Sequence, residues 1–224
     1  FAGFEIWDKG SFGGAKDPDM IPREYSREAH KRGLAYESSL GVNPFKFGVV
    51  GSTDTHTSLS STTEDNFFGK VSSVEPTVDP IRFKEKITGY LPDPQGRDYT
   101  IRHAQAAASG LAAVWARENT REALWDAMAR KETFGTTGTR LRVRVFAGFG
   151  FEASDLYRSD FAEHGYDHGV PMGGDLSASK KSPKLLVRAL RDPDGANLDR
   201  VQIIKGWLDT SGATHERVYD VAVS

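Results

Sequence analysis

The hydrophobic residues of this chain change their spacing near residue 140, and this change limits the folds that the chain can adopt. Before it, the segment that follows Asn119 places its apolar residues at helical spacing. After it, apolar residues alternate with arginines over Arg140–Val145, which is the pattern of a half-buried strand. We therefore expect an α/β fold, with mixed helices and strands over residues 1–140 and a β-rich region over residues 141–224.

Hydrophobic pattern and turn residues predict the individual elements. Helices are expected at residues 22–40, ending at Gly41, and at 81–87, 104–116, 119–131 and 154–164. In the helix at 119–131, Asn119 is expected to cap the N-terminus while Glu122 reaches back to it. Strands are expected at 45–51, 141–145, 184–190, 200–207 and 217–223, with a loop at 52–70 and a turn at 133–140.

The composition excludes several classes of function. The chain contains 29 basic and 31 acidic residues, so no basic excess favours nucleic acid or an anionic membrane as a partner. No run of about 18 apolar residues is present, so the sequence predicts no membrane span. Because cysteine is absent, any metal must be held by histidine, aspartate, glutamate or other oxygen ligands.

The two ends of the chain lead us to expect a piece of a longer protein. The chain begins at Phe1 within an aromatic-rich stretch and stops directly after the strand-like residues 218–223, whereas domain ends are more often polar. A targeting segment would not be visible in such a piece. Periplasmic and cytoplasmic locations therefore both stay open.

The segment Gly51–His56 carries the strongest functional signal. Asp54 and His56 follow the expected buried strand and lie two residues apart, so in extended backbone their side chains point the same way. A carboxylate and an imidazole can then bind one cation at the C-terminal end of a strand, where parallel α/β folds place active sites. The alternative is a polar loop in which Asp54 caps a turn and His56 is an ordinary surface residue.

The residues around this motif resemble one bacterial family. Asn43–Thr57 is similar to the most recognisable stretch of the family catalogued as domain of unknown function 3604. Three later segments fit the same family: Glu118–Ala123, Arg130–Gly138 and Asn197–Trp207. The resemblance covers nearly the whole chain, and a long block is more specific than the triplet Asp-x-His.

That family is similar to the PHP (polymerase and histidinol phosphatase) hydrolases, whose fold is a distorted α/β barrel with two or three metal ions. The resemblance implies that residues 1–140 are the C-terminal part of such a barrel and that 141–224 form a mainly β, sandwich-like tail. It also implies that Asp54 and His56 are ligands of a divalent metal: Zn, Mn or Fe. The early His-x-His motif of PHP enzymes does not occur here. We therefore expect the remaining ligands upstream of Phe1, and an isolated piece that is inactive.

Other polar groups have plainer interpretations. Glu163–His168 places two histidines four apart, but Gly165 and Gly169 favour an exposed loop over a chelating helix. The remaining candidates are expected to be structural or solvated: the histidines His30, His103 and His215 and the basic strand face of Arg140, Arg142 and Arg144.

Two functions of different classes stay open. The first is a metal-dependent hydrolase of a small-molecule substrate, either a phosphate ester or a carbamate or carboxylic ester. The second is a non-catalytic module in which the β-rich tail binds a ligand or partner, and exposed aromatic residues would favour it: Phe149, Phe151, Tyr157 or Trp207. Because a truncated barrel leaves strand edges unpaired, we also expect a homodimer through those edges.

Overall fold

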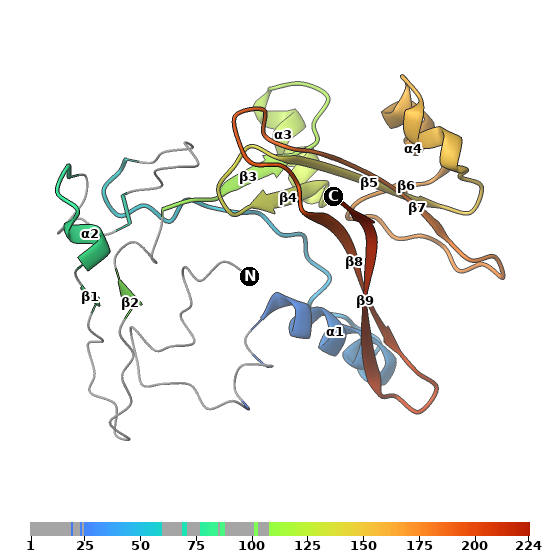
Figure 1. Ribbon diagram of the computed structural model, residues 1–224. Helices are drawn as coiled ribbons and strands as arrows, with labels where there is room; N and C mark the ends of the chain where they lie inside the picture. The colour runs from blue at the N-terminus through green and yellow to red at the C-terminus, as the bar shows by residue number, and fades with distance from the viewer. Residues whose placement is uncertain are drawn as a thin grey trace. The chain divides into compact units, whose positions relative to one another are not determined.

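The computed structural model describes residues 25–59, 69–70, 77–84, 86–87, 101–102 and 108–224, together with Asp19 and Arg23. This part of the chain contains both helices and strands, which confirms a mixed α/β composition (Figure 1). In chain order the elements are α1 (Ser26–Leu40), α2 (Ile81–Lys84), β1 (Lys86–Ile87), β2 (Ile101–Arg102), β3 (Leu111–Val114), α3 (Arg121–Ala129), β4 (Thr133–Thr136), β5 (Arg142–Gly148), the 3₁₀ helix η4 (Ala153–Tyr157), α4 (Phe161–His168), β6 (Val170–Pro171), β7 (Lys184–Leu190), β8 (Arg200–Leu208) and β9 (Thr214–Val223). The described strands form small separate sheets and no closed barrel.

Two compact units combine stretches that are distant in the sequence. Unit 1 contains residues 1–46, 53–109 and 202–221, and unit 2 contains residues 47–52, 110–201 and 222–224. The expected division into a barrel part, 1–140, and a tail, 141–224, stays a prediction. No helix among the described residues is long and apolar enough to cross a membrane.

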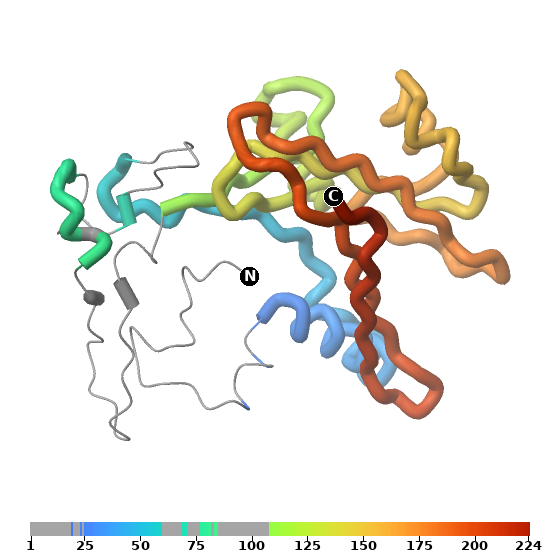
Figure 2. Tube along the Cα trace, in the orientation of Figure 1, coloured from blue at the N-terminus to red at the C-terminus, as the bar shows by residue number. Residues whose placement is uncertain are grey.

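In unit 1, helix α1 lies beside the hairpin of β8 and β9, as Figure 2 shows for the blue and red segments. The helix ends as predicted at Gly41, whose φ of 74° is a left-handed conformation that suits glycine. Arg27 Nε donates to Glu216 Oε2 at 2.8 Å, and Lys31 Nζ lies 3.6 Å from the same oxygen. These two cations attach α1 to β9.

In unit 2, β5 is the central strand of a three-stranded antiparallel sheet with β6 on one side and β7 on the other. The predicted strands in β5, β7, β8 and β9 are confirmed. Phe146 of β5 is fully buried, and its ring meets that of Phe161 in α4 edge to face, with centroids 5.6 Å apart. Helix α4 therefore covers one face of this sheet (Figure 1).

Helix α4 corrects two predictions, the loop at 163–168 and the single helix at 154–164. The second is split by an extended residue, Arg158, between η4 and α4. Gly165 argued against a helix because glycine has a low helical propensity. In the structure it lies so close to the sheet that a Cβ there would stand 2.5 Å from the Phe146 ring. The glycine thus allows the helix to approach the sheet, and the packing of α4 outweighs its propensity.

The expected helix at 104–116 is wrong where the structure describes it, and the expected turn at 133–140 is wrong over residues 133–136, whereas residues 137–139 do bend. Strands β3 and β4 pair there, with Leu111 opposite Thr136 and Val114 opposite Thr133. Residues 104–107 lie outside the described residues. Alanine-rich segments favour a helix intrinsically, and cross-strand pairing overrides that preference here.

The expected buried strand at 45–51 is also wrong, because the segment has no regular structure and Val49 is 51% exposed. The segment instead approaches β4, where Thr133 Oγ1 donates to the Val49 carbonyl oxygen at 3.0 Å. Gly51 comes so close that a Cβ there would stand 2.6 Å from the Thr136 carbonyl oxygen. An irregular segment packed against a strand is a contact that hydrophobic spacing does not encode.

The two remaining predicted helices shift or shorten. Helix α3 begins one residue later than expected, because Thr120 rather than Asn119 caps it and accepts from Ala123 N at 3.3 Å. Helix α2 ends at Lys84, and residues 86–87 form a strand instead of its last turn.

Candidate functional site

Asp54, His56 and Lys70 form a cluster in unit 1. His56 Nε2 lies 3.2 Å from Asp54 Oδ1, and Lys70 Nζ makes an ion pair with Asp54 Oδ2. The structure therefore brings together the two residues that the Asp-x-His motif singled out. It adds Lys70, which lies sixteen residues after Asp54 in the sequence and carries no recognisable motif.

A turn, rather than the expected extended backbone, brings these side chains together. Asp54 has a φ of 51°, a left-handed conformation that aspartate adopts more readily than most residues. His56 N donates to the Gly69 carbonyl oxygen at 2.9 Å, and Thr55 Oγ1 donates to the same oxygen at 2.8 Å. These bonds hold the loop against the residue before Lys70, so that the ammonium reaches the Asp54 carboxylate.

The charges of this cluster differ in their exposure. The side chain of Lys70 is 4% exposed, whereas those of Asp54 and His56 are 60% and 58% exposed. The hydrogen bond from Lys70 is the largest of the effects that hold the pKa of Asp54 below its ordinary value, and the hydrogen bond from His56 adds to it. The Asp54 carboxylate is therefore ionised at neutral pH.

The geometry of Asp54 and His56 fits two ligands of one divalent cation. Zinc binds carboxylate oxygen and imidazole nitrogen at about 2.1 Å, so two ligand atoms of a tetrahedral site lie about 3.4 Å apart. The observed separation of 3.2 Å is close to that value. The described residues contain no group of three or more His, Asp or Glu side chains that could hold a metal. Any further ligands would have to come from other parts of the protein.

The histidines of α4 form a helical pair in place of the expected exposed loop. The rings of His164 and His168 stack with centroids 4.3 Å apart, and His164 Nε2 lies 3.2 Å from Asp155 Oδ1. His168 Nδ1 lies 3.1 Å from the His164 carbonyl oxygen, so one ring nitrogen already has a local partner. This pair is explained by contacts within η4 and α4.

The two remaining described histidines have different partners, a backbone carbonyl for His30 and a carboxylate for His215. His30 Nδ1 lies 3.0 Å from the Phe45 carbonyl oxygen, and His215 Nε2 lies 2.6 Å from Asp209 Oδ2. Both are exposed, which agrees with the surface positions expected for them. His103 lies outside the described residues.

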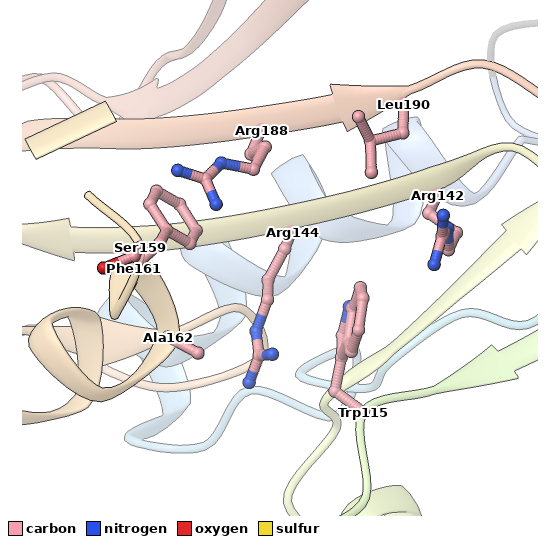
Figure 3. Close-up of a pocket in the computed structure, with 8 residues that line it drawn as sticks. All are labelled: Trp115, Arg142, Arg144, Ser159, Phe161, Ala162, Arg188 and Leu190. Carbon is pink, nitrogen blue, oxygen red and sulfur yellow. The ribbon is translucent and has the colours of Figure 1, made fainter. Parts of the chain in front are cut away.

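The expected basic strand face separates into one paired arginine and two that line a cavity. Arg140 Nη2 lies 3.3 Å from Asp194 Oδ2, and the Arg140 amide donates to Asp192 Oδ2 at 2.6 Å. Arg142 and Arg144 instead line a cavity of about 220 Å³ in unit 2 (Figure 3). The sequence predicted an exposed face here and gave no sign of the cavity.

Glu132 is a buried charged residue that sequence reasoning did not single out. It is 1% exposed, accepts from the Tyr166 hydroxyl at 2.5 Å and lies 3.1 Å from Arg130 Nη2. Tyr166 in turn accepts from Arg144 Nη2 at 3.0 Å. Burial, followed by the nearby Glu132 carboxylate, raises the pKa of Tyr166 above its ordinary value.

These features define a mixed α/β chain with an exposed carboxylate–imidazole pair and a separate arginine-lined cavity. Over residues 1–224 the chain matches the family described as protein of unknown function (DUF3604), and it belongs to that family. Comparisons with curated proteins and with solved structures gave no match.

Proposed function

We propose that this protein is a metal-dependent hydrolase of the PHP type, in which Asp54 and His56 are two ligands of a divalent metal. The observation that carries the proposal is the exposed pair of Asp54 Oδ1 and His56 Nε2, whose 3.2 Å separation suits a shared ion. Residues 43–57 resemble the most recognisable stretch of the DUF3604 family, and the similarity of that family to PHP enzymes, in which Asp-x-His residues are metal ligands, supports it. In this proposal residues 1–140 contribute to a distorted α/β barrel that other parts of the protein complete.

The side chains of this cluster would have different roles in binding such an ion. Lys70 keeps Asp54 ionised and pairs with its Oδ2, while Oδ1 lies beside His56 Nε2. An imidazole binds a metal only through a nitrogen that carries no proton, so the affinity of the site for the metal would fall in acid. A bound metal supplies Lewis-acid activation of a water molecule and of the scissile phosphoryl or carbonyl group. The substrate class is a phosphate ester, or a carbamate or carboxylic ester.

The cavity in unit 2 favours a second function, a module that binds a ligand or partner. Of the four aromatic residues expected to be exposed for that purpose, only Tyr157 is strongly so, at 89%, while Phe151 is buried. Phe149 and Trp207 are half-buried. An exposed aromatic patch therefore does not support the second function, and the arginine-lined cavity does.

Metal binding by the protein at its full natural length tests the first proposal. The wild type and an Asp54→Ala/His56→Ala variant are loaded with Zn²⁺, Mn²⁺ or Fe²⁺, and the retained metal is measured by plasma mass spectrometry. An Asp209→Ala/His215→Ala variant is the matched control, because it removes another exposed carboxylate–imidazole pair. We expect metal to be lost only in the Asp54/His56 variant. Absence of binding by the wild type, or equal retention by both variants, contradicts the proposal.

An activity screen on the metal-loaded protein then identifies the bond that is cleaved. The substrates are p-nitrophenyl phosphate, p-nitrophenyl acetate and a p-nitrophenyl carbamate. We expect hydrolysis of one of these classes by the wild type and by the Asp209/His215 control, and none by the Asp54/His56 variant. A metal-loaded wild type that cleaves none of the three would refute the hydrolase assignment even if the metal site were real.

A further inference from the structure

The cavity in unit 2 lies on one face of the sheet that β5 and β7 form. Its lining includes three arginines and three large apolar side chains: Arg142, Arg144, Arg188, Trp115, Phe161 and Leu190. The strand register places Arg144 directly opposite Arg188, and Arg142 directly opposite Leu190. Figure 3 shows the Arg188 guanidinium beside the Phe161 ring and the Arg144 side chain beside the Trp115 indole.

The three arginines of the cavity concentrate positive charge on this face. Like charges that lie directly opposite on paired strands repel, so the facing pair Arg144 and Arg188 costs stability. Within the described part of the chain, none of the three makes a direct ion pair with a carboxylate, whereas Arg140 pairs with Asp194. The positive charge of this face therefore has no direct counter-ion among the described residues.

Arg188 is held in position by uncharged partners. Its Nη2 donates to the carbonyl oxygen of Leu156 and, at 3.2 Å, to that of Arg158. Its Cζ lies 3.9 Å from the centroid of the Phe161 ring, which is a cation–π contact. These contacts orient the guanidinium at the cavity and leave its charge without a direct anionic partner.

Arg144 is held in a similar way, but one of its buried nitrogens has no hydrogen-bond partner among the described residues. Its Cζ lies 4.4 Å from the centroid of the Trp115 ring, and one terminal nitrogen donates to Tyr166. The Tyr166 hydroxyl donates onward to Glu132, a carboxylate that Arg130 already pairs. Arg144 Nε is buried and has no hydrogen-bond partner among the described residues. A buried N–H without an acceptor is costly, so keeping Arg144 at the cavity lowers the stability of the fold.

The size and the apolar lining of the cavity limit what can occupy it. Its volume of about 220 Å³ lies below the 300–1,000 Å³ that is typical of pockets for drug-sized ligands. The occupant is therefore a small molecule or the terminal group of a larger one. Trp115, Phe161 and Leu190 offer flat apolar surface next to the guanidinium groups.

We propose that this cavity binds a small organic oxyanion, a carboxylate or phosphate group carried on an apolar ring. The arginines donate to the anionic oxygens with the planar N–H geometry that suits such groups. The ring packs against the aromatic and leucine side chains. All lining residues of this cavity belong to unit 2, whereas Asp54 and His56 belong to unit 1.

Ligand-observed NMR titration of the whole chain with four probes tests this site. Benzoate and phenyl phosphate carry both recognised features, benzamide removes the charge from benzoate, and inorganic phosphate removes the ring from phenyl phosphate. We expect saturable binding of benzoate or phenyl phosphate, and binding at least about tenfold weaker for the corresponding probe that lacks charge or ring. Comparable binding of inorganic phosphate and phenyl phosphate would overturn the role of the ring.

Two variants with the same change in charge locate the binding. Arg142→Gln removes an exposed guanidinium that lines the cavity, and Arg140→Gln removes one that pairs with Asp194 outside it. We expect Arg142→Gln to weaken binding about tenfold and Arg140→Gln to leave it unchanged. Equal effects of the two substitutions would show nonspecific attraction to positive charge and overturn the proposal. So would the absence of saturable binding of both aromatic anions by the wild type.

Discussion

Substitution of Gly165 by alanine has two opposite effects on stability, a gain in helix propensity and a loss in packing. Alanine is favoured over glycine inside a helix by about 1 kcal/mol, so propensity alone predicts that Gly165→Ala stabilises α4. A Cβ at this position would stand 2.5 Å from the ring of Phe146, which is fully buried. That ring cannot withdraw freely, because it also meets Phe161 at 5.6 Å and Tyr166 at 5.2 Å between centroids.

Overpacking of a well-filled core typically costs about 1–3 kcal/mol. An approach of 2.5 Å to a fully buried ring places the cost in the upper part of this range, at about 2–3 kcal/mol. After the gain of about 1 kcal/mol in propensity is subtracted, we expect Gly165→Ala to lower the free energy of unfolding by about 1–2 kcal/mol. For a chain of this size the corresponding fall in Tm is about 2–8 °C. Thermal unfolding followed by near-ultraviolet circular dichroism measures it, and hydrogen exchange of the β5 amides assigns the effect to unit 2.

The matched control for this substitution is Gly150→Ala. A Cβ at Gly150 would meet no atom within 4 Å, so this variant should unfold within about 0.5 kcal/mol of the wild type. If Gly165→Ala proved as stable as the wild type or more stable, the close approach of α4 to Phe146 would be wrong.

Two further predictions concern buried charges. Lys70→Met removes the ammonium that favours the ionised form of Asp54, so NMR titration should show the pKa of Asp54 rising toward its ordinary value. Because the pKa of Asp54 is lowered in the folded state, the stability that this carboxylate contributes is present above about pH 4 and is lost as pH falls through the folded pKa. The Lys70→Met variant should therefore lose less stability in acid than the wild type. An acid unfolding profile equal to that of the wild type would count against the ion pair of Lys70 and Asp54. Glu132→Gln should lower the pKa of Tyr166 while burial still holds it above the ordinary value, which ultraviolet titration of the phenol measures. It should also reduce the free energy of unfolding by about 1–3 kcal/mol, because the buried partners lose a charged acceptor; unchanged values of both would show that Glu132 is not the partner of Tyr166.

Local patterns predicted those parts of the fold that local forces determine. The strands of β5, β7, β8 and β9 follow from alternating or apolar runs, and the end of α1 follows from Gly41. The predictions failed where distant segments meet. Gly165 and Gly51 looked like a helix breaker and a strand end, but each is a place where backbone approaches another element too closely for a side chain. Such approaches depend on partners that a local window does not contain.

The candidate site was likewise predicted from the sequence only in part, where its contacts are local. Asp54 and His56 were found because a two-residue spacing suffices to bring their side chains together, even though a left-handed turn does so instead of a strand. Lys70 was missed because its contact spans sixteen residues and depends on the bonds that Gly69 makes to the loop. The sequence thus indicated the carboxylate and the imidazole, and the structure was needed to show that Lys70 pairs with the carboxylate.

The arginine-lined cavity shows why register carries functional information that period does not. The alternation of residues in a strand predicts that Arg142 and Arg144 share a face, but it does not predict which residues lie opposite them. A shift of one residue between β5 and β7 would place Val187 or Ala189 opposite Arg144, and the concentration of charge would disappear. The observed pairing places Arg188 there instead, and each guanidinium lies over an aromatic ring from another segment, Arg144 over Trp115 and Arg188 over Phe161. The recognition chemistry of this face therefore arises from strand pairing, and no motif within either strand encodes it.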